Sequence, residues 1–334
     1  MTYNEIQTDA IVCWVDGSDP EHAAKRQRTL QNKANKSWHI LPAGLTAQRF
    51  SDNGELKYCI YSIRKFMPWI RRIFLVTDEQ QPSFLTAEAC NQLDVQIISH
   101  KHIFRNHEAV LPTFNSQSIE TAIHRIEGLA EAYIYFNDDV IALQPIQKTD
   151  FFCGRKLVLR GRWQPLKKHG TARIIISALL NHIYSALNLR ERAMSTLPQY
   201  KAAELAGLSK LYIKAPHVPH PVITRTLIDF FHENPDLFEE NIKHAFRSMK
   251  QFVTQPLAAS LEISKGNFIL SEEEDYIMIR FSREEMVCED LKQLITGNYK
   301  FVCLQGLDCA SMEARNEITE FLEDRIFGTP ITHF

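Results

Sequence analysis

LPTFNSQSIETAIHRIEGLAEAYIYFNDDV, residues 111–140, decides the fold, because it joins a polar helical pattern to an apolar strand that ends in acidic residues. In the helical part, Ile119, Ile123 and Ile126 recur at three- and four-residue spacing and mark a face for the core. A buried strand with carboxylates at its carboxyl end is the usual way in which an α/β sheet holds a metal-bound phosphate ligand. The stretch therefore predicts an α/β fold with an active site where this strand ends.

The three polar residues at the strand end are predicted to divide between two faces. Side chains alternate along a strand, so continued alternation puts Asn137 and Asp139 on one face and Asp138 on the other. Asn137 and Asp139 are therefore the predicted metal-binding pair. In the helix before the strand, Glu120 and His124 are four residues apart and share a stripe. For an Asp-Asp pair taken alone, a solvated turn or a helix cap is the common alternative.

Similar apolar runs recur along the first half of the chain and alternate with helical patterns. The predicted strands are Asp9–Val15, Ile73–Thr77, Val95–Ser99 and Tyr133–Phe136, and the helical patterns cover 54–66 and 116–128. Such alternation is typical of a mainly parallel sheet covered by helices. We find no internal repeat, and we interpret residues 1–334 as one catalytic domain with a helical insertion at about residues 165–210. Pro221 is predicted in the first turn of a later helix.

Composition excludes several classes of protein. With 334 residues and 45% hydrophobic content, the chain can bury a large core. Its net charge of -2 gives no signal for nucleic acid, and the basic clusters at 160–162 and 167–168 lack the interleaved aromatic residues of a single-strand groove. No run approaches the ~20 apolar residues of a membrane span, and the N-terminus shows no secretion signal. The seven scattered cysteines lack a C-x-x-C pair and indicate reduced thiols, so a cytoplasmic protein is expected.

Polar residues also follow the other predicted strands or precede a predicted helix. In the loop after the first strand, Gly17 allows close backbone approach, and Asp16 suits either a tight turn or a hydrogen bond to a nucleoside. The guanidinium group of Arg49 matches phosphate geometry, whereas Asp52 and Glu55 at a helix start ordinarily serve as caps. The predicted set for a nucleotide at this sheet edge is Asp16, Gly17, Asp19, Arg49, Asp52, Asn53, Thr77 and Asp78.

Four blocks of this sequence resemble, in the same order, the four conserved regions of the Stealth family of sugar-1-phosphate transferases. They are DAIVCWVDGSDP (9–20), residues 49–80 with 111–140, HVPHPVITRTLIDFF (217–231) followed by Arg247, and residues 300–334. The fourth block departs from the pattern, because Gln305 and Gly306 stand where family members commonly carry an Asn-Asp pair. Asp308, two residues further on, is the candidate metal ligand that would replace that pair.

The resemblance implies a GT-A-like nucleotide-sugar fold and the transfer of a hexose-1-phosphate from a UDP-sugar donor to a hydroxyl of a glycan or phosphoglycan acceptor. A phosphodiester would form and UMP would be released, in the synthesis of capsule or another cell-surface polysaccharide. Mg²⁺ or Mn²⁺ would bind at Asp139, His217 would accept the proton of the acceptor hydroxyl, and Arg247 would stabilise charge on the phosphorus. The resemblance further assigns to the site Glu120, His124 and Arg125.

Two alternatives stay open from the sequence: a metal-dependent GT-A glycosyltransferase, and a catalytically silent nucleotide-sugar-binding subunit, which the altered fourth block favours. The acceptor is expected near residues 160–210, where Trp163 offers a ring for a sugar face. We expect a bacterial protein without a nucleic-acid partner and with at most peripheral association with the inner face of the cell membrane. Assembly into a homo-oligomer is left open.

Overall fold

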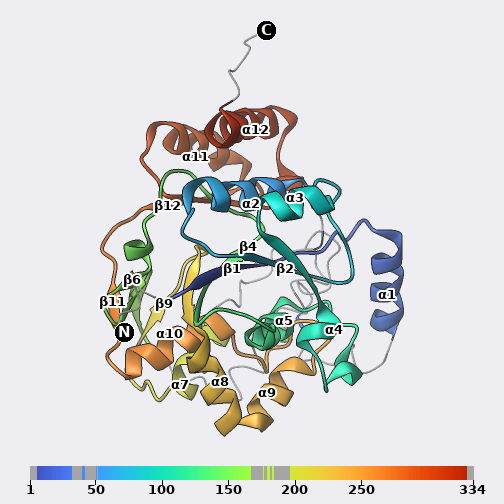
Figure 1. Cartoon of the computed structure of the whole chain (residues 1–334), viewed down its shortest axis with the longest axis vertical. Coiled ribbons are helices and arrows are strands. Elements are labelled where there is room, and N and C mark those ends of the chain that lie inside the picture. Colours follow the sequence, from blue (N-terminus) through green and yellow to red (C-terminus); the bar gives the residue numbers. More distant parts are fainter. Residues whose placement is uncertain are drawn as a thin grey trace.

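A five-stranded sheet forms the centre of the computed structural model, which describes residues 6–31, 40–41, 50, 52–166, 176, 179–180, 183 and 196–328 (Figure 1). Its strand order is β10-β4-β1-β2-β3, and only the edge strand β10 is antiparallel to its neighbour. The bounds are β1 Thr8–Cys13, β2 Ile73–Thr77, β3 Val95–Ser99, β4 Ala132–Asn137 and β10 His220–Ile223. The predicted α/β class with a mainly parallel sheet is confirmed, and the apolar runs form strands because both faces of such a sheet are buried.

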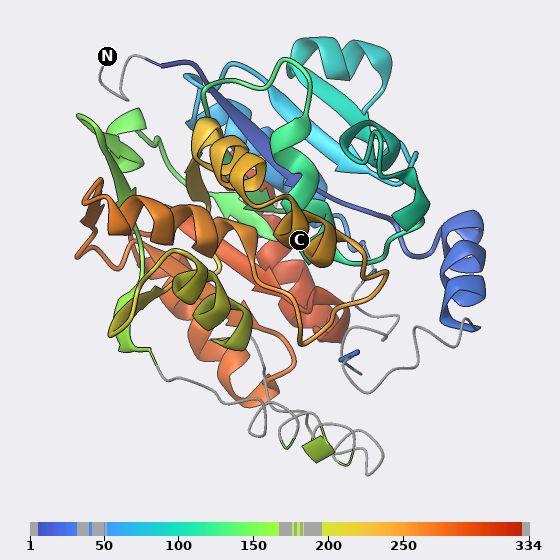
Figure 2. The ribbon, with the colours of Figure 1, turned by 90° about the horizontal axis from the view of Figure 1, so that it is seen from below.

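Helices cover both faces of this sheet (Figures 1 and 2). On one face, Ile60 of α2 (Glu55–Phe66) packs in a cluster that includes Val12 of β1. On the other face, Ile11 of β1 belongs to a second cluster, to which several helices contribute. These include α5 Ser116–Ala122, α8 Thr224–Glu233, α9 Pro235–Ile242 and α10 Thr254–Ser264. Neighbouring residues of β1 thus enter opposite clusters, as the two-residue period of a strand requires.

After a turn, β4 continues into a second sheet of order β12-β13-β5. Its strands are β5 Val140–Ala142, β12 Tyr276–Arg280 and β13 Phe301–Gln305, and helices α11 Glu284–Thr296 and α12 Met312–Phe327 accompany it (Figure 1). β5 pairs antiparallel with β13, and Cys303 is the register partner of Val140. The C-terminal block of the sequence therefore returns to the end of β4.

Two smaller sheets, β11-β7-β6 and β8-β9, lie outside the central one. Their strands are β6 Phe152–Cys153, β7 Lys156–Leu159, β8 Arg162–Pro165, β9 Leu211–Lys214 and β11 Phe268–Leu270. Of the predicted insertion at about 165–210, α7 (Thr196–Leu205) is helical and packs against α10. The stretches 167–175, 177–178, 181–182 and 184–195 lie outside the described residues.

Pro221 lies in the edge strand β10 and not in a helix, so that prediction is wrong. Edge strands tolerate proline because its missing N–H does not have to serve an inner ladder. The remaining elements are α1 Pro20–Gln31, α3 Ala87–Gln92, α4 His100–Ile103 and the 3₁₀ helices η4 Glu108–Val110, η5 Ile123–Arg125, η6 Lys148–Asp150 and η7 Leu307–Cys309. Among the described residues, no helix has both the length and the apolar character needed to cross a membrane.

Candidate active site

The strand order creates a topological switch point between β1 and β4. From β1 the chain runs outward to β2 and β3 and then returns to the other side of β1. Ligands of open α/β sheets bind at the carboxyl ends of the strands beside such a point. Here Cys13 and Asn137 are register partners at the ends of β1 and β4. His220, the first residue of β10, pairs with Tyr135 near the same edge, so His217 also precedes β10 there.

The end of β4 differs from the predicted strand. β4 ends at Asn137. The next two residues, Asp138 and Asp139, form a turn, and β5 begins at Val140. The carbonyl oxygen of Asp139 accepts a hydrogen bond from the backbone N–H of Leu304 (2.9 Å). The prediction that alternation separates Asp138 from Asp139 is therefore wrong, because the chain leaves the central sheet at this point to pair with β13.

The turn after β4 concentrates negative charge. Burial raises the pKa of Asp138 well above its usual range, and the charges of Asp139 and Glu55 raise it further. Burial also raises the pKa of Asp139 to about 6, against the opposing effect of a hydrogen bond from Cys303. A nearby cation relieves repulsion between carboxylates and restores their charged form. The electrostatics of the turn thus favour a bound cation.

The chemistry of this turn fits a hard divalent cation that is shared with a ligand. Mg²⁺ prefers oxygen ligands, and proteins commonly hold it with one or two carboxylates together with substrate phosphates. Asp138 and Asp139 supply two carboxylates, and Asn137 lies beside them at the end of β4. Within the described ranges, no group of three or more His, Cys, Asp or Glu side chains is arranged to hold a metal by itself. Asp308, in η7, is not among the charged neighbours of Asp138 or Asp139.

A second polar group lies between α5, β4 and the loop after α9. The Tyr135 hydroxyl donates to Glu120 Oε1 (3.2 Å), and Arg247 Nη2 donates to Ser116 Oγ (2.7 Å). Burial raises the pKa of Glu120 to about 7, and the positive charge of Arg247 opposes the rise. The structure therefore brings Glu120 and Arg247 together from distant parts of the sequence. A carboxyl group with such a pKa can hold or release a proton near neutral pH.

Cys13 connects this group to the acidic turn. Burial is the largest cause that raises the pKa of the Cys13 thiol, and the charges of Glu120 and Asp138 raise it further. The side chain of Tyr135, which bonds Glu120, also bonds Cys13. The Glu120–Arg247 group and the acidic turn are therefore neighbouring parts of one site.

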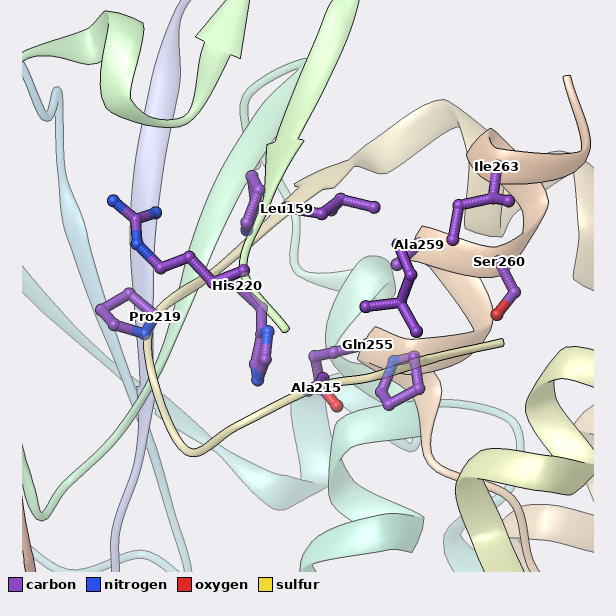
Figure 3. A pocket seen from close by; sticks show the side chains of 12 residues that line it. Leu159, Ala215, Pro219, His220, Gln255, Ala259, Ser260 and Ile263 are labelled. Carbon is purple, nitrogen blue, oxygen red and sulfur yellow. The ribbon is translucent and has the colours of Figure 1, made fainter. Parts of the chain in front are cut away.

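The two histidines of the third block differ in exposure. His217 is exposed, whereas His220 is half-buried and lines a small cavity with Arg160 and Gln255 (Figure 3). Burial lowers the pKa of His220 to about 4, and the charges of His217 and Arg160 lower it further, so His220 is neutral at physiological pH. The cavity, with a volume of about 20 Å³, has room for about one water molecule and not for a sugar. His217 is thus the more exposed histidine of this pair.

The loop after β1 is held by contacts within the chain. Asp16 Oδ1 accepts a hydrogen bond from the backbone N–H two residues further on (2.8 Å), and the Gly17 N–H donates to the carbonyl of Phe50 (2.5 Å). A Cβ at Gly17 would lie 2.3 Å from Phe50 Cβ, so the close approach predicted for this glycine is made to Phe50. Asp19 caps α1 by accepting from the N–H of His22 (2.8 Å), and this bond lowers the pKa of Asp19.

The acidic residues at the start of α2 bind the backbone of the turn that leads into the helix. Asp52 Oδ1 accepts from the backbone N–H two residues on (2.9 Å), and Glu55 Oε2 accepts from the N–H of Asn53 (2.7 Å). Neither side chain caps α2, whose N-cap position has no side-chain hydrogen bond. Burial nevertheless raises the pKa of Asp52 and of Glu55, and Glu55 acts on the acidic turn through its charge. Arg49 lies outside the described residues.

Thr77 and Asp78 end β2 beside α1 and α4. Thr77 is fully buried, and Lys25 Nζ lies 3.7 Å from Asp78 Oδ2. His100 Nδ1 is 4.0 Å from Asp78 Oδ1, but burial lowers the pKa of His100 to about 4 and keeps the ring neutral. Asp78 is not among the charged neighbours of Asp138. This pair therefore lies on the predicted edge, but β1 separates its strand from β4 and the acidic turn.

His124 and Arg125 lie apart from the other candidates. The ring of His124 stacks on Phe231 with 5.1 Å between centroids, and the guanidinium group of Arg125 lies 5.3 Å from the centroid of the Phe238 ring. These aromatic residues belong to α8 and α9, and burial lowers the pKa of His124 to about 4. The structure thus places both residues in the helical layer and does not bring them to the carboxyl edge of the sheet.

Sequence reasoning missed one contact of the acidic turn. Cys303 Sγ lies 3.5 Å from Asp139 Oδ2. A cysteine inside an apolar run is most often a packing residue. The only signal for a further role was its position in the fourth block, two residues before the altered Gln305–Gly306 pair.

Comparisons with known proteins match part of this chain to a conserved region and to polysaccharide phosphotransferases. Residues 49–159, which include β4 and the acidic turn, match the family model for the Stealth protein CR2, conserved region 2. An exopolysaccharide phosphotransferase of Streptomyces coelicolor is 42% identical over 147 residues, and a capsular polysaccharide phosphotransferase of Actinobacillus suis is 40% identical over 152 residues. These matches cover 43% and 45% of this chain but only 14% and 39% of the relatives. A capsular polysaccharide phosphotransferase of Aeromonas hydrophila is 35% identical over 193 residues, which is 55% of this chain and 51% of the relative.

Two solved structures resemble this chain with low TM-scores. Mouse xyloside xylosyltransferase 1, in its apo form, has a TM-score of 0.38 and 11% identity, over 89% of this chain and 97% of that chain. The galactosyltransferase LgtC, solved with donor and acceptor sugar analogs, has a TM-score of 0.42 and 10% identity, over 82% of this chain and 93% of that chain. The match to the conserved region and the identities with the phosphotransferases show that the chain carries the conserved region 2 of the Stealth proteins at residues 49–159.

Proposed function

We propose that this protein transfers a sugar-1-phosphate from a UDP-sugar to a hydroxyl group of a glycan in the synthesis of a surface polysaccharide. The observation that carries the proposal is the meeting of Glu120 and Arg247 beside Asp138 and Asp139 at the switch point of the sheet. This arrangement offers an arginine and a cation-favouring turn, which are the groups that phosphoryl transfer requires. The names of the relatives support a phosphotransferase role.

In the proposed reaction, the acceptor hydroxyl oxygen attacks the phosphorus that carries the sugar. A new phosphorus–oxygen bond forms, and the bond to the oxygen that bridges the two phosphorus atoms breaks. UMP leaves, the anomeric bond stays intact, and the acceptor proton passes to the exposed imidazole of His217. A Mg²⁺ or Mn²⁺ ion at this site would neutralise charge on the diphosphate. Asp138 and Asp139 would hold it together with the donor phosphates.

Arg247 and Glu120 act in the proposal as a paired charge. The guanidinium group of Arg247 is anchored on Ser116 and faces the equatorial oxygens of the phosphoryl group in the transition state. Glu120, held by the Tyr135 hydroxyl, balances the charge of Arg247 and fixes its position. Because Glu120 has a pKa of about 7, its ionisation changes the strength of this pairing in the physiological range.

Product analysis tests the reaction directly. The protein is incubated with a panel of UDP-hexoses, Mg²⁺ and acceptor oligosaccharides, and the products are followed by phosphorus NMR and nucleotide chromatography. The proposal requires release of UMP together with a new phosphodiester signal. Release of UDP with a glycosidic bond would instead identify a glycosyltransferase, and binding of the nucleotide sugar without turnover would identify a silent binding subunit.

Matched arginine variants test the assignment of the site. Arg247→Ala removes the cation of the pair, whereas Arg225→Ala removes an exposed arginine of α8 that pairs with Asp229 on the same helix. We expect UMP release to fall by about 100-fold or more in the first variant, the size typical for loss of a preorganised charge in the transition state. The second variant should keep wild-type turnover. Equal activities of the two variants would exclude Arg247 from the chemistry.

A further inference from the structure

Strand β13 holds the acidic turn at two points. The Cys303 thiol lies 3.5 Å from Asp139 Oδ2, and the backbone N–H of the next residue, Leu304, donates to the Asp139 carbonyl (2.9 Å). Antiparallel pairing of Cys303 with Val140 fixes the register in which both contacts occur. The main chain and the side chain of Asp139 are thus both held from the same strand.

The thiol is suited to donate in this contact. Cys303 is 2% exposed, and its thiol is the donor in the contact with the carboxylate of Asp139. The S–H bond engages Oδ2, and a carboxylate held in this way has lost much of its rotational freedom. Partners that orient a carboxylate are usual around protein metal sites and affect metal affinity although they do not touch the metal.

Neighbouring groups do not duplicate this contact. The thiol of Cys59, also fully buried, lies 3.7 Å from the main-chain oxygen of Asn137 and not from a carboxylate oxygen. Further along the fourth block, Gln305 is exposed, and Asp308 is not among the charged neighbours of Asp139. The described part of this block therefore reaches the acidic turn through Cys303 and Leu304.

We propose that Cys303 is a positioning residue, which orients the carboxylate of Asp139 for a divalent cation through its S–H hydrogen bond. The proposal rests on the proposed function, because it needs Asp139 to be a ligand of that cation. It gives the altered fourth block a definite part in the site, because Cys303 of this block orients a ligand that lies in the turn after β4.

Binding of Mn²⁺, measured by EPR as the loss of the free-ion signal, tests the proposal without any catalytic assay. The titrations use the full chain with Mn²⁺ alone and with Mn²⁺ plus UMP. Cys303→Ala should raise the Kd for Mn²⁺ by about 10-fold, at the lower end of the effect of losing an orienting partner, because a thiol is a weak donor. Cys303→Ser keeps a donor and should stay close to the wild type. Cys59→Ala, which removes another buried thiol near the turn, should leave the Kd unchanged.

Further variants separate this proposal from the metal assignment. Cys303→Val removes the donor but keeps the space in the core filled. It is used in place of Cys303→Ala if circular dichroism shows that the alanine variant is unfolded. If Asp139→Asn binds Mn²⁺ with the wild-type Kd, Asp139 is not a ligand. Both the metal assignment and the positioning role of Cys303 are then refuted. If Asp139→Asn weakens Mn²⁺ binding but Cys303→Ala and Cys303→Val do not, only the positioning role is overturned. Equal weakening in Cys303→Ala and Cys59→Ala would also overturn it, because the effect would then come from packing.

Discussion

Replacing Glu120 by glutamine should make the free energy of unfolding of this protein less dependent on pH. Glu120 is buried, and burial raises the pKa of its carboxyl group from a usual value of 4.5 to about 7. The neutral carboxyl group therefore contributes stability that is fully present below pH 4.5 and is lost as the pH rises through about 7. Glutamine has nearly the same shape and cannot ionise, so the variant does not undergo this loss.

The magnitude follows from the two pKa values. Each pH unit between them corresponds to about 1.4 kcal/mol, so complete ionisation of Glu120 in the folded protein costs about 3 kcal/mol. By proton linkage, about 2.5 kcal/mol of this stability is lost as the pH rises from about 5 to about 8. The attraction between ionised Glu120 and Arg247 opposes the rise in the pKa of Glu120 and is already contained in the value of about 7, so it adds no separate amount. Glutamine lacks this attraction at every pH. The difference in pH dependence therefore isolates Glu120.

Urea unfolding followed by tryptophan fluorescence measures this difference. Free energies of unfolding are determined for the wild type, Glu120→Gln and the control Glu127→Gln at several pH values across that range. Glu127 has an 84% exposed side chain, so its replacement should leave a curve parallel to that of the wild type. The free energy of unfolding of Glu120→Gln should increase relative to that of the wild type as the pH rises. Parallel curves for all three proteins would refute the assignment of a buried carboxyl group that ionises near neutral pH.

Three further predictions concern the site and its surroundings. Asp138→Asn and Asp139→Asn should both abolish metal-dependent release of UMP, since the turn leaves both carboxylates at the site. Substantial activity in Asp138→Asn alone would instead support the prediction that only Asp139 faces the metal. Gly17→Ala should lower the melting temperature by several degrees in a thermal scan, because its Cβ would lie 2.3 Å from Phe50 Cβ, and an unchanged value would contradict the tight contact. Trp163→Ala, at a ring that is 39% exposed, should raise the acceptor KM and leave that of the UDP-sugar unchanged, whereas the reverse pattern would remove Trp163 from the acceptor site.

Local patterns in the sequence determined most of the secondary structure. The strands predicted at Ile73–Thr77 and Val95–Ser99 have those bounds in the structure, and Asn115 caps α5 by accepting from a backbone N–H (3.2 Å). Apolar periodicity and capping depend on residues within a few positions of each other, so they can be read without knowledge of the fold. The resemblance of the second block to a Stealth conserved region was likewise visible in the sequence, and the family model matches residues 49–159.

The tertiary structure alone decided how the candidate residues combine. Alternation along β4 gave the wrong result for Asp138 because pairing with β13, more than 150 residues away in the chain, ends the strand at Asn137. The raised pKa of Glu120 and its attraction to Arg247 arise because distant segments remove water from the same space. His124, four residues from Glu120 on one helical stripe, instead stacks on an aromatic residue of another helix. Spacing in the sequence fixes which side chains share a face, but only the packing of distant elements fixes what that face meets.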